Sequence, residues 1–242
     1  KNAPIRFLAL GDSYTIGESV AEVQRWPNQL VYALTRRGYR LERPEIVAMT
    51  GWRTDQLKDA IEARNLPGNF DLVSLLIGVN NQYQGKSIAE YEVEFQELLM
   101  LAIKHASGQK SNVFVLSVPD YGYTPFGRKK QADISKQIDA FNAVNRRVTT
   151  ENGVAYINIT DISRRGFHDE ALVAEDGTPF LPDRIVVAPG ESHLMVDEVN
   201  GKLVARLLKS KAASGCLPSV DPMLASAGGV LGGAALGVIL TR

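Results

Sequence analysis

Ser13, Gly51 and Asn80 each follow a short apolar segment of the chain, and together they could carry out acyl transfer. A serine hydroxyl can attack an acyl carbonyl, while backbone N–H groups and an amide side chain can bind the oxyanion that forms. Taken singly, each residue has an ordinary explanation, because serine caps helices and both glycine and asparagine are common in turns. In combination they predict a serine nucleophile with three oxyanion donors: the N–H groups of Ser13 and Gly51, and the Asn80 side chain.

The segments that must position these residues alternate between strand and helix patterns. Buried strands are predicted at Ile5–Leu10, Glu45–Ala48, Leu72–Ile77, Val113–Ser117 and Tyr156–Ile159. Helical spacing of apolar residues is clearest in Trp26–Arg37, Thr54–Ala63, Ile88–Ala106 and Ile134–Thr150. This alternation predicts an α/β protein, a three-layer α/β/α sandwich around a parallel five-stranded sheet. Binding sites in such sheets gather at the carboxyl ends of the strands, where the three residues stand.

The composition narrows the class of function. The 242 residues carry 27 Lys and Arg against 27 Asp and Glu, so a nucleic-acid partner held by phosphate contacts is not expected. Cys216 is the single cysteine, which excludes an internal disulfide framework, and no Cys/His cluster has zinc-ligand spacing. We expect a small-molecule substrate and neither a metal nor an organic cofactor.

The C-terminal part differs in character from the rest of the chain. A globular domain is predicted over residues 1–211, ending with a helix at Val196–Lys211, and residues 212–242 form a Gly/Ala-rich tail. Leu224–Leu240 is uncharged but short and glycine-rich for a membrane helix, so a weakly packed tail is preferred over a membrane contact. The N-terminus shows no apolar signal-peptide core. The compartment, cytoplasmic or exported after processing, and the oligomeric state stay open.

Three blocks of the chain resemble, in order, those of the SGNH (GDSL-type) hydrolases: Gly11-Asp12-Ser13, Gly51 and Gly78-Val79-Asn80-Asn81. The surrounding sequence is similar to a bacterial branch of esterases and lysophospholipase-like enzymes, and the resemblance is strongest over residues 5–177. It implies a flavodoxin-like SGNH fold with Ser13 as the nucleophile. It also implies that the Ser13 N–H, the Gly51 N–H and the Asn80 side chain bind the oxyanion.

The family's fourth block, Asp-x-x-His, is altered or missing here. The lead-in ends at Asp176-Gly177, and Pro179 stands where the histidine is expected. His193, which begins a plausible final helix, is the best candidate for the base. Asp176, by motif match, or Glu191, by proximity, would orient it.

Two other histidines are weaker candidates for the base. His105 follows a lysine near the end of a long predicted helix and is interpreted as a solvated or dipole-facing residue. His168 precedes the expected block and is interpreted as a surface residue. A reading-frame shift after Gly177 is a further explanation for the missing block.

The resemblance implies a serine hydrolase that cleaves carboxylic esters, with short-acyl, acetyl-sugar and lysophospholipid-like substrates all open. Four aromatic residues that follow the strands could line an acyl or sugar pocket, or could simply pack in loops: Trp52, Tyr83, Tyr121 and Tyr123. The chief alternative is a catalytically impaired protein of the same fold that binds a ligand without turning it over. A flavodoxin-like nucleotide binder is a weaker alternative, because no phosphate-cradling glycine loop follows the first strand.

Overall fold

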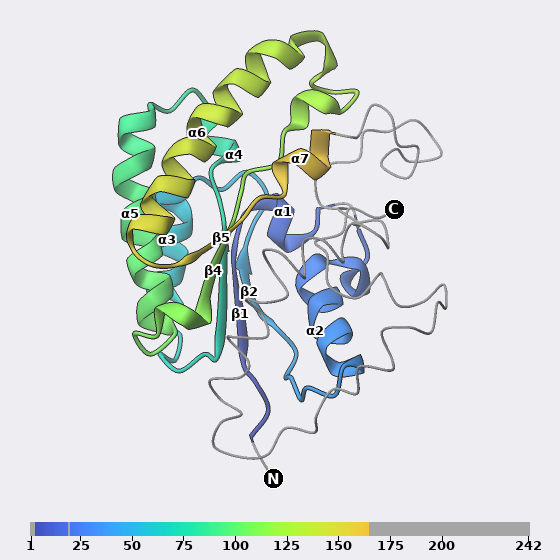
Figure 1. Ribbon diagram of the computed structural model, residues 1–242, viewed down its shortest axis with the longest axis vertical. Coiled ribbons are helices and arrows are strands. Elements are labelled where there is room, and N and C mark those ends of the chain that lie inside the picture. The colour runs from blue at the N-terminus through green and yellow to red at the C-terminus, as the bar shows by residue number, and fades with distance from the viewer. Residues whose placement is uncertain (1–2, 19, 165–242) are drawn as a thin grey trace.

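A single parallel sheet organises the computed structural model, which describes residues 3–18 and 20–164 (Figure 1). Its strands are β1 (Phe7–Gly11), β2 (Glu45–Ala48), β3 (Leu72–Leu76), β4 (Val113–Leu116) and β5 (Ala155–Ile157). All neighbouring strands pair in parallel, in the order β2-β1-β3-β4-β5. This is the doubly wound order of flavodoxin-like folds, and it confirms the predicted five-stranded α/β architecture.

Helices cover both faces of the sheet. The helices are α1 (Ser13–Ile16), α2 (Trp26–Arg36), α3 (Thr54–Ala63), α4 (Val79–Tyr83), α5 (Ile88–His105), α6 (Gln131–Glu151) and α7 (Thr160–Ser163). Short 3-10 turns occur at η1 (Glu22–Gln24), η2 (Lys110–Asn112), η3 (Tyr121–Tyr123) and η4 (Arg128–Lys130). In Figure 1, α3, α5 and α6 lie on one side of the sheet, and α1, α2 and α7 lie on the other. The sheet is therefore the middle of three layers.

The central strands are apolar on both faces because each face packs against a helical layer. All five residues of β1 and all five of β3 are buried. Since side chains alternate along a strand, the neighbours Leu75 and Leu76 enter different core clusters. Leu75 packs in the cluster that contains Phe95 of α5, and Leu76 packs in the one that contains Trp26 of α2.

The predicted boundaries differ from the observed ones mainly at chain turns. The helix at Thr54–Ala63 has the predicted bounds. The first strand begins at Phe7, because Ile5 forms only an isolated bridge with Leu41. The last strand ends at Ile157, because Ile159 is already the N-cap of α7. Helix α6 begins at Gln131, three residues before the prediction, since its polar first turn gives no apolar periodicity to read.

Several predictions lie outside the described residues. They are the helix at Val196–Lys211, the tail at 212–242 and the domain boundary at residue 211, which all stay predictions. Of the helices formed by residues 3–18 and 20–164, none is long and apolar enough to span a membrane.

Candidate active site at the ends of three neighbouring strands

Strand order brings Ser13, Gly51 and Asn80 to one edge of the sheet. They follow β1, β2 and β3 respectively, and β1 lies between the other two strands. The last residue of β1, Gly11, is in register with the final residues of both neighbours, Ala48 and Leu76. Ser13 is thus flanked on one side by the loop that carries Gly51 and on the other by the turn that carries Asn80.

Ser13 is the first residue of the one-turn helix α1. The cap of this helix is Asp12, whose side chain accepts a hydrogen bond from the Tyr14 N–H at 3.0 Å. The helix is therefore capped by Asp12 and not by Ser13, so the Ser13 hydroxyl is available to act as a nucleophile. Within the described residues, neither the Ser13 N–H nor its Oγ donates to a protein acceptor. An unused N–H at a helix start is a suitable oxyanion donor.

Asp12 lies between the ends of β1 and β3. Its carboxyl group accepts hydrogen bonds from the N–H groups of Tyr14 and Gly78, so it links the turn of the serine to the turn of the asparagine. The residue is 1% exposed, and its Oδ2 has no hydrogen-bond partner. Burial raises the pKa of Asp12 to about 8, despite the opposing effect of the N–H donors. The carboxyl group is therefore largely protonated at neutral pH.

Gly51 adopts a backbone conformation that suits glycine. Its φ is 82°, in the left-handed region, while a Cβ built at this position would meet no atom within 4 Å. The requirement is therefore conformational and not steric, and the space beside the residue is open. Its N–H makes no backbone hydrogen bond within the described part of the chain, while its carbonyl accepts one from Gln84 Nε2 at 3.1 Å.

Asn80 is held in place by the loop after β2. Its Nδ2 donates to the Trp52 carbonyl oxygen at 2.9 Å, which fixes the plane of the amide. The Nδ2 group carries a second hydrogen that can serve an oxyanion. The preceding turn depends on Gly78, whose φ is 133° and whose missing Cβ would lie 2.9 Å from the Tyr91 ring.

The sequence assigned no separate role to the next residue, Asn81, although it belongs to the block Gly78-Val79-Asn80-Asn81. It is fully buried, accepts from the Thr54 N–H at 3.1 Å and donates to Thr54 Oγ1 at 2.6 Å. Thr54 Oγ1 in turn donates to Glu94 of α5. Asn81 thereby fixes the start of α3, and with it the loop of Gly51, against α4. Burial of an amide with two partners on another element is a tertiary fact that no local pattern reports.

Of the two interpretations of His105, the solvated one was wrong, whereas its place in the last turn of α5 agrees with the dipole-facing one. It is 8% exposed, and its Nδ1 lies 3.5 Å from the Pro67 carbonyl oxygen, in a position where burial lowers its pKa. Its own carbonyl accepts from the N–H of Phe70, which precedes β3. His105 therefore lies at the amino end of the sheet, a strand length from Ser13, and cannot be its base.

The remaining base and acid candidates lie outside the described residues: His168, His193, Asp176 and Glu191. Their roles stay predictions.

Of the four aromatic residues that could line a pocket, two come together. The rings of Tyr83 and Tyr121 have centroids 6.1 Å apart. Trp52 instead packs against the core cluster beneath α3 and α5, which is the ordinary loop packing offered as an alternative.

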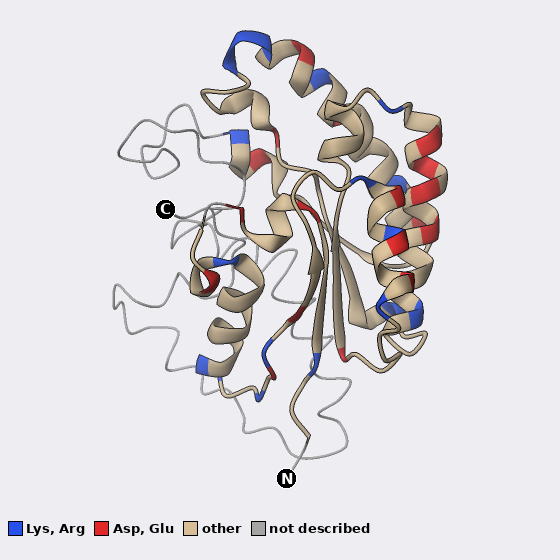
Figure 2. Cartoon of the chain, turned by 180° about the vertical axis from the view of Figure 1, so that it is seen from behind, with Lys and Arg blue, Asp and Glu red and all other residues tan. Residues whose placement is uncertain are grey.

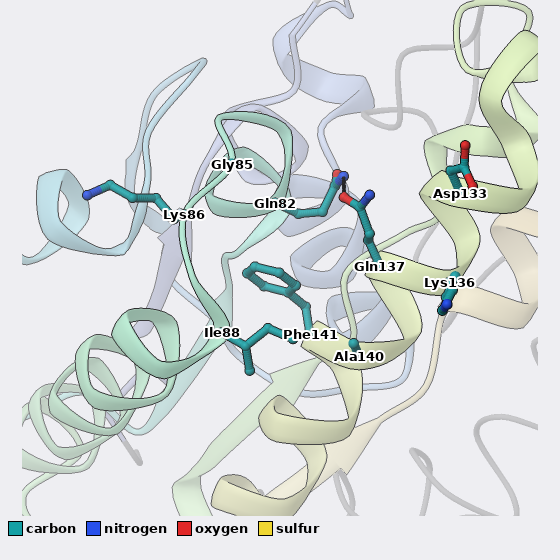
Figure 3. A pocket seen from close by; sticks show the side chains of 9 residues that line it. All are labelled: Gln82, Gly85, Lys86, Ile88, Asp133, Lys136, Gln137, Ala140 and Phe141. Atoms are coloured by element: carbon teal, nitrogen blue, oxygen red, sulfur yellow. Dashed lines mark hydrogen bonds between the residues drawn. The ribbon is translucent and has the colours of Figure 1, made fainter.

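A pocket of about 510 Å3 is lined by residues of α4, α6 and the segment between α4 and α5 (Figure 3). Phe141 and Ile88 project into it, and Gln82 Nε2 donates to Gln137 Oε1 at 2.7 Å across one end. Neither Ser13, Gly51 nor Asn80 lines this pocket. It is therefore separate from the predicted site.

Comparisons with solved structures agree with this architecture. The chain is similar to a lipase/acylhydrolase from Enterococcus faecalis, with 18% identity, a TM-score of 0.57 and coverage of 86% of this chain and 96% of that one. It is also similar to AlinE4, an SGNH-hydrolase family esterase, with 17% identity, a TM-score of 0.54 and coverage of 86% and 98%. TesA gives 18% identity, a TM-score of 0.54 and coverage of 85% and 99%. At these identities the likeness establishes the fold.

The C-terminal part has a different likeness. Residues 167–242 match the CheB methylesterase family. A protein-glutamate methylesterase/protein-glutamine glutaminase from Treponema denticola is 39% identical over 72 residues, which are 30% of this chain and 19% of that protein. One from Rhodospirillum centenum is 43% identical over 68 residues, 28% and 17% of the two chains.

The chain thus spans about a fifth of the length of the curated relatives it matches. Such similarity is not expected from translation in a wrong frame, so a frame shift after Gly177 does not account for this segment.

The larger match covers the sheet and the three residues at its edge. Residues 9–185 match the GDSL-like lipase/acylhydrolase family, more than half of the chain, and overlap the second match only at 167–185. The chain therefore belongs to the GDSL-like lipase/acylhydrolase family.

Proposed function

We propose that the protein cleaves carboxylic esters through an acyl-enzyme formed on Ser13. The observation that carries this proposal is the convergence of Ser13, Gly51 and Asn80 at the ends of three adjacent strands. The Ser13 and Gly51 N–H groups have no backbone acceptors within the described residues, and Asn80 is oriented by Trp52. Groups held in this way need no reorganisation when charge develops on the carbonyl oxygen.

The reaction follows from these groups. A base takes the Ser13 proton as Oγ forms a bond to the acyl carbon, and the carbonyl oxygen becomes an oxyanion bound by the three donors. The bond to the alcohol oxygen then breaks, and the alcohol leaves with the proton. Water attacks the acyl-enzyme in the same way and releases the acid and free Ser13. His193 is proposed as the base and Asp176 as its orienting acid, and neither lies within the described residues.

The test is hydrolysis of p-nitrophenyl acetate and butyrate by the full chain and its variants. Ser13→Ala should lower kcat by at least about a thousandfold, while the matched control Ser111→Ala, an exposed serine of η2, should leave it unchanged. Asn80→Ala should lower kcat by about a hundredfold with little change in KM, because its amide acts on the transition state. Activity that survives in Ser13→Ala would exclude the proposal.

The base assignment needs its own variants. His193→Ala should match the loss seen for Ser13→Ala, whereas His168→Ala should keep wild-type kcat. The reverse result would reject His193 and assign the base to His168. A protein that hydrolyses no ester above the buffer rate would instead be the ligand-binding alternative.

A second candidate substrate is favoured by the match of residues 167–242 to protein-glutamate methylesterases. Methyl esters of glutamate side chains in a peptide belong in the same assay. If release of methanol is lost in Ser13→Ala, the esters are cleaved at the GDSL-type site. Release that persists in Ser13→Ala would place the activity on another nucleophile.

A further inference from the structure

Three aromatic side chains form an exposed cluster at the same edge of the sheet as the proposed site. The ring cluster consists of Tyr83, Tyr121 and Phe126, with centroids 6.1 to 6.2 Å apart. Tyr83 is 59% exposed and Phe126 is 62% exposed. Grouped apolar surface of this kind marks a binding site more often than an isolated exposed ring does.

The ring cluster is held in place by the turns that follow β4. Thr124 Oγ1 donates to the Tyr121 carbonyl at 2.7 Å and accepts from the Gly127 N–H at 3.3 Å. A Cβ on Gly127 would lie 2.2 Å from the Tyr121 carbonyl oxygen, so these turns are packed backbone to backbone. At their root, Asp120 forms an ion pair with Arg164 of 3.0 Å. The rings are therefore ordered before any ligand arrives, which lowers the entropic cost of binding.

The cluster is adjacent to the proposed oxyanion donor through α4. Tyr83 follows Asn80 by three residues on this helix, so the ring cluster lies within one helical turn of the proposed donor. Gln82, between them, donates to Gln137 of α6 (Figure 3) and its side chain also interacts with Tyr121 of the ring cluster. An acyl group whose carbonyl oxygen is bound by Asn80 would have to extend over about one helical turn to reach the ring of Tyr83.

Positive charge lies beside the rings. Lys129 and Lys130 of η4 follow Phe126 closely in the chain and are exposed, and their side chains form no ion pair or hydrogen bond with residues 3–18 and 20–164. Figure 2 shows η4 at the carboxyl end of the sheet and acidic residues gathered along α5. All three residues of η4 are basic, so this turn is locally positive although the formal net charge of the whole chain is zero.

We propose that the ring cluster, with Lys129 and Lys130, binds the acyl part of an ester that is apolar near its carbonyl and anionic at its far end. The monoesters of dicarboxylic acids belong to this class. The apolar carbons would lie on the rings, and the distal carboxylate would meet the two lysines. Hydrolysis of such an ester rests on the proposed function of Ser13, whereas its binding to the ring cluster does not.

The test compares two matched esters with acyl chains of equal length, p-nitrophenyl pentanoate and mono-p-nitrophenyl glutarate, together with the acetate. Phe126→Ala should lower kcat/KM about tenfold for both longer esters, through KM, and leave the acetate unchanged. The double variant Lys129→Gln with Lys130→Gln should lower kcat/KM only for the glutarate ester, by about three- to tenfold at low salt. This effect should vanish in high salt.

Matched controls exist elsewhere on the surface. Val93 of α5 is 61% exposed, and Lys110 of η2 is exposed, so Val93→Ala and Lys110→Gln should leave all three rates unchanged. Phe126→Tyr keeps the ring and should keep the wild-type selectivity. Equal losses on acetate, pentanoate and glutarate in Phe126→Ala would overturn the proposal, because they indicate damage to the fold and not to a subsite.

Binding to Ser13→Ala separates this proposal from the proposed function. Titration of that variant with methyl pentanoate and monomethyl glutarate should show tighter binding of the glutarate, lost when both lysines are replaced. If wild type hydrolyses no ester yet this selectivity is found, the proposed function fails and the subsite stands. If Ser13-dependent hydrolysis is found without this selectivity, the subsite fails alone. Lysine variants that lose only sedimentation with anionic vesicles would reject the subsite in favour of a membrane contact.

Discussion

At the scale of single residues, the site depends on a buried acid, Asp12, that the sequence indicated only as part of the Gly11-Asp12-Ser13 block. Asp12 does cap α1, but it also binds the Gly78 N–H and so joins the turns of Ser13 and Asn80. Its Oδ2 has no partner, and its pKa is raised because desolvation outweighs the donors. A neutral carboxyl at this position keeps negative charge away from the place where the oxyanion would form.

This environment predicts how stability depends on pH. Between its unfolded pKa of 3.8 and its folded pKa of about 8, Asp12 binds a proton more tightly in the folded chain. As pH rises through that window, the unfolded state gains by ionising and the folded state loses relative stability, by on the order of several kcal/mol. Asp12→Asn removes the titration while keeping the shape, so its free energy of unfolding should rise relative to wild type from about pH 5 to about pH 8.

Urea unfolding at both pH values measures this difference. Asp133→Asn, an exposed acid in the first turn of α6 with no partner among the described residues, is the control and should show no such trend. A constant difference between Asp12→Asn and wild type at the two pH values would show that Asp12 is ionised throughout.

At the scale of elements, the short helix α4 carries most of the site's geometry. It has five residues, too few to be stable alone, and it is held by side chains that leave it in different directions. Asn80 binds the loop after β2, Asn81 binds the start of α3, and Tyr83 enters the ring cluster. Its direction is set by Gly78, where β3 turns into it.

Two glycines test this dependence. Gly78→Ala combines an unfavourable φ of 133° with a Cβ 2.9 Å from the Tyr91 ring, so it should destabilise the fold by about 3 kcal/mol and lower kcat by displacing Asn80. Gly85→Ala, at the other end of α4, has φ 72° but open space, and should cost about 1 kcal/mol with unchanged kcat. Thermal unfolding and ester kinetics measure both. Equal effects of the two substitutions would refute a special role for the Gly78 turn.

At the scale of the whole molecule, one sheet is shared by two cores. The clusters on its two faces share the strands between them, and β3 is buried along its whole length. Loss of either cluster would expose the same strands, so the described body should unfold as one unit.

Leu75 and Leu76 allow a direct comparison, since they are neighbours on β3 with exposures of 0% and 2% and enter opposite clusters. Leu75→Ala and Leu76→Ala should each lower the free energy of unfolding by about 2–5 kcal/mol, and each should still unfold in one transition by fluorescence and circular dichroism. Non-coincident transitions in either variant would mean that the two layers unfold separately.

The sequence by itself determined the alternation of strands and helices, the class of fold and the three residues at the strand ends. These follow from local patterns: short apolar runs buried on both faces, helical spacing between them, and the residue types that close each strand. Even the helix at Thr54–Ala63 was predicted with its observed bounds. Such local patterns could not predict which distant segments of the chain are in contact.

Only the tertiary structure decided which strand ends are neighbours, and β1 proved to lie between β2 and β3. It also decided that His105 is buried at the wrong end of the sheet, that Asp12 is desolvated, and that Phe126 joins Tyr83 and Tyr121. Burial and proximity depend on how the whole chain packs. The residue types at each position therefore indicate the chemistry, while the fold decides which of them can meet to perform it.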